Sequence, residues 1–256
     1  MARLTIFLLL SALFRATPFF ADTGFLDRQM RLKGKTYRYQ VFVPADFTPA
    51  NRWPVLVDLH GNGAQGEDGI RQTAHMLGEQ IRMSRGHFRF ITVFPQAGSG
   101  SNWLDPVMQE MVLAETDRTI SEFKGDETRV YLSGFSMGAT GAYRIAARWP
   151  KRFAALIAIA GVVEFVRMPE RDGPDSRVFS SLAKQLESIP TWIFHGEFDK
   201  EVPPAQSRQL YVELKKIGAP VTFTEYASTT HGPAAEKAYA DDKLWSWLLA
   251  QRRDRR

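Results

Sequence analysis

The sequence contains no cysteine among its 256 residues. This absence excludes disulfide bonds, thiolate metal sites, iron–sulfur clusters and a cysteine nucleophile. It does not identify a cellular compartment, because oxidising compartments also hold proteins without cysteine. A thiol nucleophile is therefore excluded, and the search for a nucleophile turns to an oxygen such as that of a serine.

The sequence also lacks a hydrophobic run long enough to cross a bilayer. Its longest apolar stretch, Leu4–Phe14, is too short for a stable membrane span. Preceded by Arg3, it matches the charged and apolar regions of a secretory signal, although no A-x-A cleavage site follows. We therefore expect residues 1–21 to be a signal peptide and the protein to be secreted or periplasmic. An uncleaved anchor and a buried N-terminal helix are the alternatives.

An excess of positive charge is absent from the body of the chain. The net charge is +5, from 33 basic and 28 acidic residues. Arg3, Arg15 and the last five residues, 252–256, account for all of this excess, so the residues between them sum to zero. A nucleic-acid partner requires a basic stripe or a recognised binding module, and neither is found. We interpret residues 252–256 as a solvated basic tail.

Short apolar segments separated by turn residues predict the strands of a sheet. Alternation from Arg31 to Val43 around Gly34-Lys35 indicates an antiparallel hairpin. The later runs are almost continuously apolar, which is typical of strands buried on both faces of a parallel sheet. These runs are Val55–Leu59, Phe90–Phe94, Arg129–Leu132, Ala154–Ile159, Thr191–Phe194 and Val221–Tyr226.

Helical periodicity lies between these strands. The alternation predicts an α/β fold in which helices cover a mostly parallel, doubly wound sheet. No linker or repeat divides residues 22–251, so we expect one domain, with residues 162–190 as a loop or small cap. The predicted helices are Ile70–Arg82, Val107–Phe123, Met137–Trp149, Ser180–Leu186, Ala205–Ile217 and Ala234–Ala250.

The motif Gly134-Phe135-Ser136-Met137-Gly138 lies between a predicted strand and a predicted helix. A sharp turn there lifts a serine out of the sheet, and the flanking glycines relieve the crowding that the turn produces. The motif alone is weak, but its position favours Ser136 as a nucleophile. The alternative is an ordinary serine N-cap between turn glycines.

Partners for such a serine follow later in the chain, in the order acid and then histidine. Asp199 lies just beyond the strand Thr191–Phe194, and Glu197 is its nearest rival. His231 lies in the loop after the last strand, where it can accept the serine proton while Asp199 orients its ring. We interpret the nearby His195 as structural.

A second glycine-rich turn, Leu59-His60-Gly61-Asn62-Gly63, follows an early strand. Ester hydrolysis requires two N–H donors for the tetrahedral oxyanion. Met137, directly after the serine, offers one amide; we favour the Asn62 amide for the other, with Gly61 and Gly63 as alternatives. The turn lacks the spacing of a nucleotide-binding loop.

Substrate contacts are predicted at Gly61 and Trp103. Trp103 lies in the loop that follows the strand Phe90–Phe94, on the ligand side of the sheet. It can line an acyl or aromatic pocket, or it can be a core residue that covers the sheet edge. No lid of lipase size is visible, which favours small-molecule or polymer-end esters over lipid aggregates.

Over residues 30–250 the sequence resembles the α/β-hydrolase superfamily, and within it the small bacterial esterases related to polyhydroxybutyrate depolymerases, feruloyl esterases and the phospholipase/carboxylesterase group. The resemblance implies a triad of Ser136, Asp199 and His231 and oxyanion donors at Asn62 and Met137. Related sequences commonly have glycine where this chain has Ala139. The matching motifs are Val41-Phe42-Val43-Pro44, Leu59-His60-Gly61, Phe94-Pro95-Gln96, Gly134-Phe135-Ser136-Met137-Gly138 and His195-Gly196, Asp199 and Val202-Pro203.

The leading hypothesis is a serine esterase that hydrolyses carboxylic esters through an acyl-enzyme. Some members of the resembling families are identified as peptidases related to prolyl oligopeptidase, so a serine peptidase is the alternative. A non-catalytic binding protein on the same scaffold is a third, less favoured hypothesis, because Ser136, Asp199 and His231 are all present. Such a triad requires neither a metal ion nor an organic cofactor.

Overall fold

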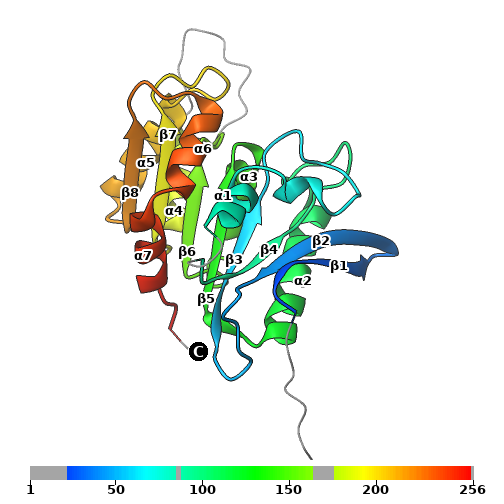
Figure 1. The fold of residues 1–256 in the computed structure, drawn as a ribbon. Coiled ribbons are helices and arrows are strands. Elements are labelled where there is room, and N and C mark those ends of the chain that lie inside the picture. The colour runs from blue at the N-terminus through cyan, green and yellow to red at the C-terminus, as the bar shows by residue number, and fades with distance from the viewer. Residues whose placement is uncertain (1–21, 85–87, 164–175, 255–256) are drawn as a thin grey trace, which may run out of the picture.

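The computed structural model describes residues 22–84, 88–163 and 176–254. The predicted signal peptide at 1–21 and residues 164–175 of the predicted loop or cap lie outside these residues. The described residues form an eight-stranded sheet with the order β1-β2-β4-β3-β5-β6-β7-β8 (Figure 1). The strands are β1 (Gly24–Leu32), β2 (Lys35–Val43), β3 (Trp53–Leu59), β4 (Ile91–Phe94), β5 (Gly125–Phe135), β6 (Ala155–Ile159), β7 (Thr191–Gly196) and β8 (Val221–Tyr226).

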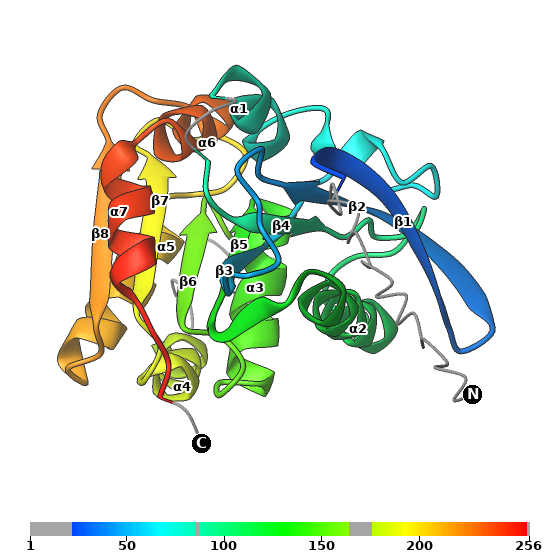
Figure 2. The ribbon, with the colours of Figure 1, turned by 60° about the horizontal axis from the view of Figure 1, so that its bottom comes forward.

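The antiparallel part of the sheet is the N-terminal hairpin, at one end, while β8 lies at the other (Figure 2). β1 begins at Gly24, earlier than the expected hairpin, and its turn is Lys33-Gly34, one residue before the predicted one. Both turn residues have positive φ, 48° and 83°, which suits the tight turn of a twisted hairpin. β2 pairs with β4 in the antiparallel sense. The pairings among β3, β4, β5, β6, β7 and β8 are all parallel.

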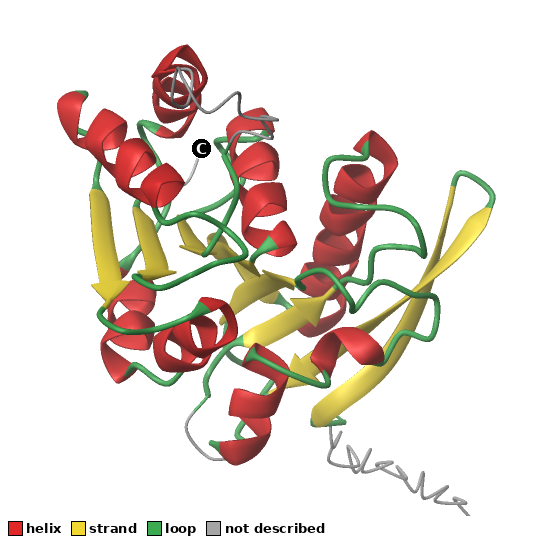
Figure 3. Cartoon of the chain, turned by 90° about the horizontal axis from the view of Figure 1, so that it is seen from above, coloured by secondary structure: helices red, strands yellow, loops and turns green. Residues whose placement is uncertain are grey.

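Helices cover both faces of the sheet, as Figure 3 shows from above. One hydrophobic core contains side chains of α2, α3, α4 and α5, and the other contains those of α1, α6 and α7. This arrangement confirms the predicted doubly wound α/β fold. The helices are α1 (Leu77–Met83), α2 (Pro106–Phe123), α3 (Met137–Arg148), α4 (Ser176–Leu186), α5 (Ala205–Lys216), α6 (His231–Tyr239) and α7 (Asp242–Ala250).

Two of the predicted helices are interrupted. The segment 70–82 divides into a 3-10 turn, η1 (Arg71–Thr73), and α1, because Met76 between them adopts a φ of 53° that no helix contains. The segment 234–250 divides into α6 and α7 at Asp241, whose side chain accepts a hydrogen bond from Lys243 N and caps the second helix. Apolar periodicity continues across both breaks, so the pattern alone does not reveal them.

The beginning of the C-terminal tail also differs from the expected solvated segment. Arg253 donates its backbone N–H to Thr128 O and its guanidinium to the carbonyl oxygens of Glu127 and Lys151. These bonds fasten Arg253 to the first residues of β5 and to the turn after α3. Among the described residues, no helix is both long and apolar enough to cross a membrane.

The topology gathers chemically competent loops at one edge of the sheet. The carboxyl ends of β3, β5, β7 and β8 are followed by the His60 turn, Ser136, the Asp199 loop and the His231 loop respectively. Parallel strands place such loops side by side, and open α/β sheets bind ligands at this edge.

Candidate active site

Ser136 occupies a strained turn between β5 and α3. Its φ and ψ are 55° and −118°, and its N–H donates to Ile159 O of β6 at 2.8 Å. A non-glycine residue with such a backbone costs of order 1–3 kcal/mol and persists only where the surroundings impose it. The serine side chain is thereby held at the sheet edge, partly exposed to solvent.

The glycines of the motif are required by close contacts between backbones. A Cβ atom at Gly134 would overlap the backbone of Gly138, and one at Gly138 would overlap the carbonyl oxygen of Leu59 at the end of β3. The residue after Gly138 is Ala139, the position that departs from the family pattern. Alanine fits because its Cβ faces Gly161, where an added Cβ would lie only 2.7 Å away.

The contact at Gly138 leads to a stability prediction. Gly138→Ala is expected to lower the free energy of unfolding by about 3 kcal/mol or more, because α3 must shift away from β3. Gly232→Ala is the matched control: it is also the second residue of a helix, but its nearest neighbour is Met76 Cε at 3.9 Å. Urea unfolding of both variants measures the difference, and equal stabilities would contradict the steric explanation.

Asp199 and His231 lie together in the structure. His231 Nδ1 is 2.6 Å from Asp199 Oδ2, and both residues are buried. The other carboxylate oxygen, Oδ1, accepts the N–H groups of Glu201 and Val202, each at 2.9 Å. The carboxylate is therefore fixed by its own loop while it holds the histidine ring.

The loops that carry these two residues are joined to each other. Phe198 N–H donates to Thr229 O, and a Cβ at Gly196 would overlap the same carbonyl oxygen. Glu197, the rival acid, points elsewhere: its Oε2 accepts the N–H of Ser228 at 2.9 Å. The structure thus places Asp199, and not Glu197, against His231.

His231 also lies next to the nucleophile turn. Its ring packs on Phe135, the residue before Ser136, with ring centroids 4.7 Å apart. The predicted serine, acid and histidine therefore lie in three loops that follow the carboxyl ends of β5, β7 and β8.

The glycine-rich turn after β3 is braced by Gln65, a residue that the sequence did not single out. Gln65 Oε1 accepts Gly63 N–H at 2.7 Å, and its Nε2 donates to Asn62 Oδ1 at 2.8 Å and contacts Met137 Sδ at 3.6 Å. Because Gly63 N–H is occupied, it is a poor oxyanion donor. Asn62 and Gly61 remain the candidate donors from this turn.

The buried side chain of His60 links the same turn to Ala97, after β4. Its Nε2 accepts Ala97 N–H at 3.0 Å, so the ring proton is on Nδ1, which donates to Gly61 O at 2.7 Å. Burial lowers the pKa of His60 to about 4, which keeps the ring neutral. His60 is thus a structural support of the turn.

Trp103 is buried, as the core alternative predicts, and it also belongs to the lining of the cavity at Ser136. Its side chain has no exposed surface, its indole N–H donates to His60 O at 2.9 Å, and it packs edge-on against the His60 ring. Although Trp103 belongs to the wall of the neighbouring cavity, its indole is directed at the turn. It supports the turn that contains Gly61.

A cavity of about 610 Å³ opens beside Ser136. Asn62 and Met137 line it together with the serine, and the rest of the lining comes from Gln65, residues 100–104, Thr140 and Val162. Its size and mixed lining are those of a small-molecule site. Among the described residues, no group of three His, Asp or Glu side chains is arranged to hold a metal ion.

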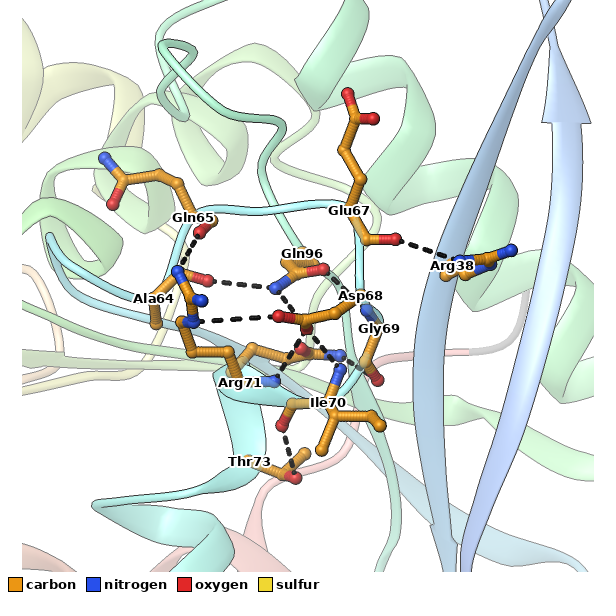
Figure 4. Close-up of polar contacts among 11 residues, drawn as sticks. Arg38, Ala64, Gln65, Glu67, Asp68, Gly69, Ile70, Arg71, Thr73 and Gln96 are labelled. Atoms are coloured by element: carbon orange, nitrogen blue, oxygen red, sulfur yellow. Dashed lines mark hydrogen bonds and ion pairs between the residues drawn. The ribbon is translucent and has the colours of Figure 1, made fainter.

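A polar cluster behind the turn fastens the loop 64–71 (Figure 4). Gln96, after β4, donates through Nε2 to Ala64 O and Asp68 Oδ1, and its Oε1 accepts Gly69 N–H at 2.8 Å. Asp68 Oδ1 also accepts the N–H groups of Ile70 and Arg71. Gln96 belongs to the motif Phe94-Pro95-Gln96, which the sequence analysis identified, although the sequence did not show that its side chain binds the loop 64–71.

Comparisons with known proteins agree with this architecture. The sequence model of a family described as "Putative esterase" matches residues 31–243. A bifunctional acetylxylan esterase/xylanase of Neocallimastix patriciarum is 29% identical over 134 residues, which are 51% of this chain and 19% of that protein. The chain thus spans about a fifth of the length of this curated relative.

Solved structures are also similar. A thermostable esterase has a TM-score of 0.73 and 27% identity, with 90% of this chain and 63% of that chain covered. An acylaminoacyl peptidase of Pyrococcus horikoshii has a TM-score of 0.68 and 16% identity, covering 91% of this chain and 43% of that one, and this likeness concerns the fold alone. With the family match extending over most of the chain, the protein belongs to the esterase family of the α/β-hydrolase fold.

Proposed function

We propose that the protein is a serine hydrolase that cleaves carboxylic esters through an acyl-enzyme, with Ser136 as the nucleophile. The observation that carries the proposal is the 2.6 Å contact between His231 Nδ1 and Asp199 Oδ2, next to a serine held on a strained turn. A carboxylate that accepts the Nδ1 proton leaves Nε2 of the ring free to accept the proton of the serine hydroxyl.

In the proposed reaction, Ser136 Oγ attacks the ester carbonyl while His231 Nε2 takes its proton. The oxyanion is stabilised by the N–H groups of Met137 and Asn62. His231 then donates the proton to the leaving alcohol, and the acyl group remains on Ser136. A water molecule, deprotonated by His231, attacks the acyl carbonyl, releases the acid and restores the serine.

The proposed substrates are small-molecule or polymer-end esters. The cavity of about 610 Å³ beside Ser136 is large enough for a modest acyl or aromatic group. A relative whose name specifies an acetylxylan esterase is consistent with a short acyl group.

The test uses the purified protein with p-nitrophenyl acetate and butyrate, and with peptide p-nitroanilides as amide substrates. We expect ester hydrolysis, and we expect a fluorophosphonate to attach covalently to Ser136, located by peptide mass spectrometry. Cleavage of the anilides without cleavage of the esters would indicate a peptidase instead. Attachment to another residue would exclude Ser136 as the nucleophile.

A further inference from the structure

The buried residue His195 lies within contact of the Asp199 carboxylate. It is next to last in β7, and its side chain is completely buried. Its Nδ1 is 2.7 Å from Ser207 Oγ of α5, and its Nε2 is 3.0 Å from Val202 O. The same Nε2 is 3.1 Å from Asp199 Oδ2.

These contacts determine which nitrogen of His195 carries the proton. A backbone carbonyl can only accept a hydrogen bond, so the contact with Val202 O requires the proton on Nε2. Nδ1 then accepts the hydroxyl proton of Ser207. Burial lowers the pKa of His195, which favours the uncharged ring. His195 is therefore a neutral Nε2–H donor aimed between Val202 O and Asp199 Oδ2.

The oxygen that His195 approaches is the one that holds His231. Asp199 Oδ2 is 2.6 Å from His231 Nδ1 and 3.1 Å from His195 Nε2, while Oδ1 accepts two backbone N–H groups. One of these N–H groups is that of Val202, whose carbonyl His195 also holds. A single imidazole thus restrains both the carboxylate and the turn that orients it.

We infer that His195, as a neutral Nε2–H donor, is a positioning residue that orients the Asp199 carboxylate toward His231 and moderates the negative charge on Oδ2. The inference rests on the proposed esterase function, because its effect on activity passes through His231. Loss of the donor frees the carboxylate to rotate and leaves more negative charge facing the His231 ring. That charge favours the imidazolium form, which cannot accept the serine proton.

The test compares His195→Leu, which removes the donor, with His195→Gln, whose amide nitrogen can replace Nε2–H. With p-nitrophenyl acetate we expect kcat of the leucine variant to fall by roughly ten- to a hundredfold, and the acid limb of kcat/KM against pH to move to higher pH. The glutamine variant should recover most of the activity and the wild-type limb. His75→Leu, which removes an exposed imidazole, should leave both unchanged.

The pH readout separates positioning from a purely structural role. Titration with a fluorophosphonate counts the active sites. A partly unfolded variant has fewer active sites, but the acid limb of its kcat/KM profile does not shift. Glu197 and Lys237, which are bonded to Ser228 N and Thr229 Oγ1 of the His231 loop, are the same in every variant. A folded leucine variant with wild-type kcat and limb would overturn the inference.

The wild-type protein offers a second test if the leucine variant does not fold. Nitrogen-15 NMR of the histidine rings, assigned with His195→Gln, should show a neutral ring protonated on Nε2 at pH 7. A ring protonated on Nδ1, or a charged ring, would overturn the inference. This measurement needs no substrate, so it tests the protonation of His195 separately from the proposed function.

Discussion

Replacing Ser136 with alanine is expected to lower kcat for p-nitrophenyl acetate by roughly 10⁵- to 10⁶-fold, to the rate supported by binding and the oxyanion amides alone. In the proposed mechanism, the serine hydroxyl is the only protein group that forms a covalent bond with the substrate. Alanine adopts the same backbone conformation as serine with similar difficulty, so the turn and the fold should persist.

Stopped assays and long incubations of the variant measure this loss, after correction for spontaneous ester hydrolysis. Ser180→Ala, in α4, serves as the control because Ser180 is exposed and its hydroxyl bonds only locally, to Arg177 O. The control should retain full activity. Residual turnover above about one-hundredth of the wild-type rate in Ser136→Ala would contradict the assignment of the nucleophile.

The second large effect is expected for Asp199→Asn, which should lower kcat by about 10⁴-fold with little change in KM. Asparagine Oδ1 can keep the two bonds from Glu201 N and Val202 N, which places its amide NH2 opposite His231 Nδ1. Because this NH2 donates, Nδ1 must accept and the ring proton moves to Nε2. The nitrogen facing the serine then carries a proton and cannot remove another.

Glu197→Gln is the matched control for this substitution. It makes the same change of carboxylate to amide two residues away, at a side chain whose Oε2 accepts from Ser228 N. We expect its kcat to remain within about threefold of the wild-type value, since that exposed bond is worth little. Equal losses in the two variants, measured on p-nitrophenyl acetate, would mean that Asp199 is not the acid of a triad.

Local patterns in the sequence were sufficient for most of the fold. Continuous apolar runs placed the parallel strands to within a few residues, because burial on both faces leaves no polar positions in them. The helix breaks at Met76 and Asp241 do not follow from the apolar spacing, which continues through both; the first coincides with the positive φ of Met76 and the second with the side-chain cap of Asp241.

The candidate site divides in the same way. The sequence by itself excluded a thiol nucleophile, because the chain has no cysteine, and it determined that Ser136 is flanked by glycines between a strand and a helix, because that motif is encoded within five consecutive residues. Only the tertiary structure decided that Asp199 rather than Glu197 faces His231, that Gly63 N–H is occupied by Gln65, and that His195 shares the Asp199 carboxylate. The acid and the histidine are 32 residues apart in the chain. Glu197 and Asp199 lie in the same loop, so sequence spacing does not show which of them faces a histidine that comes from a different loop. Their orientation depends on how β7, β8 and α5 pack, which is a property of the folded chain.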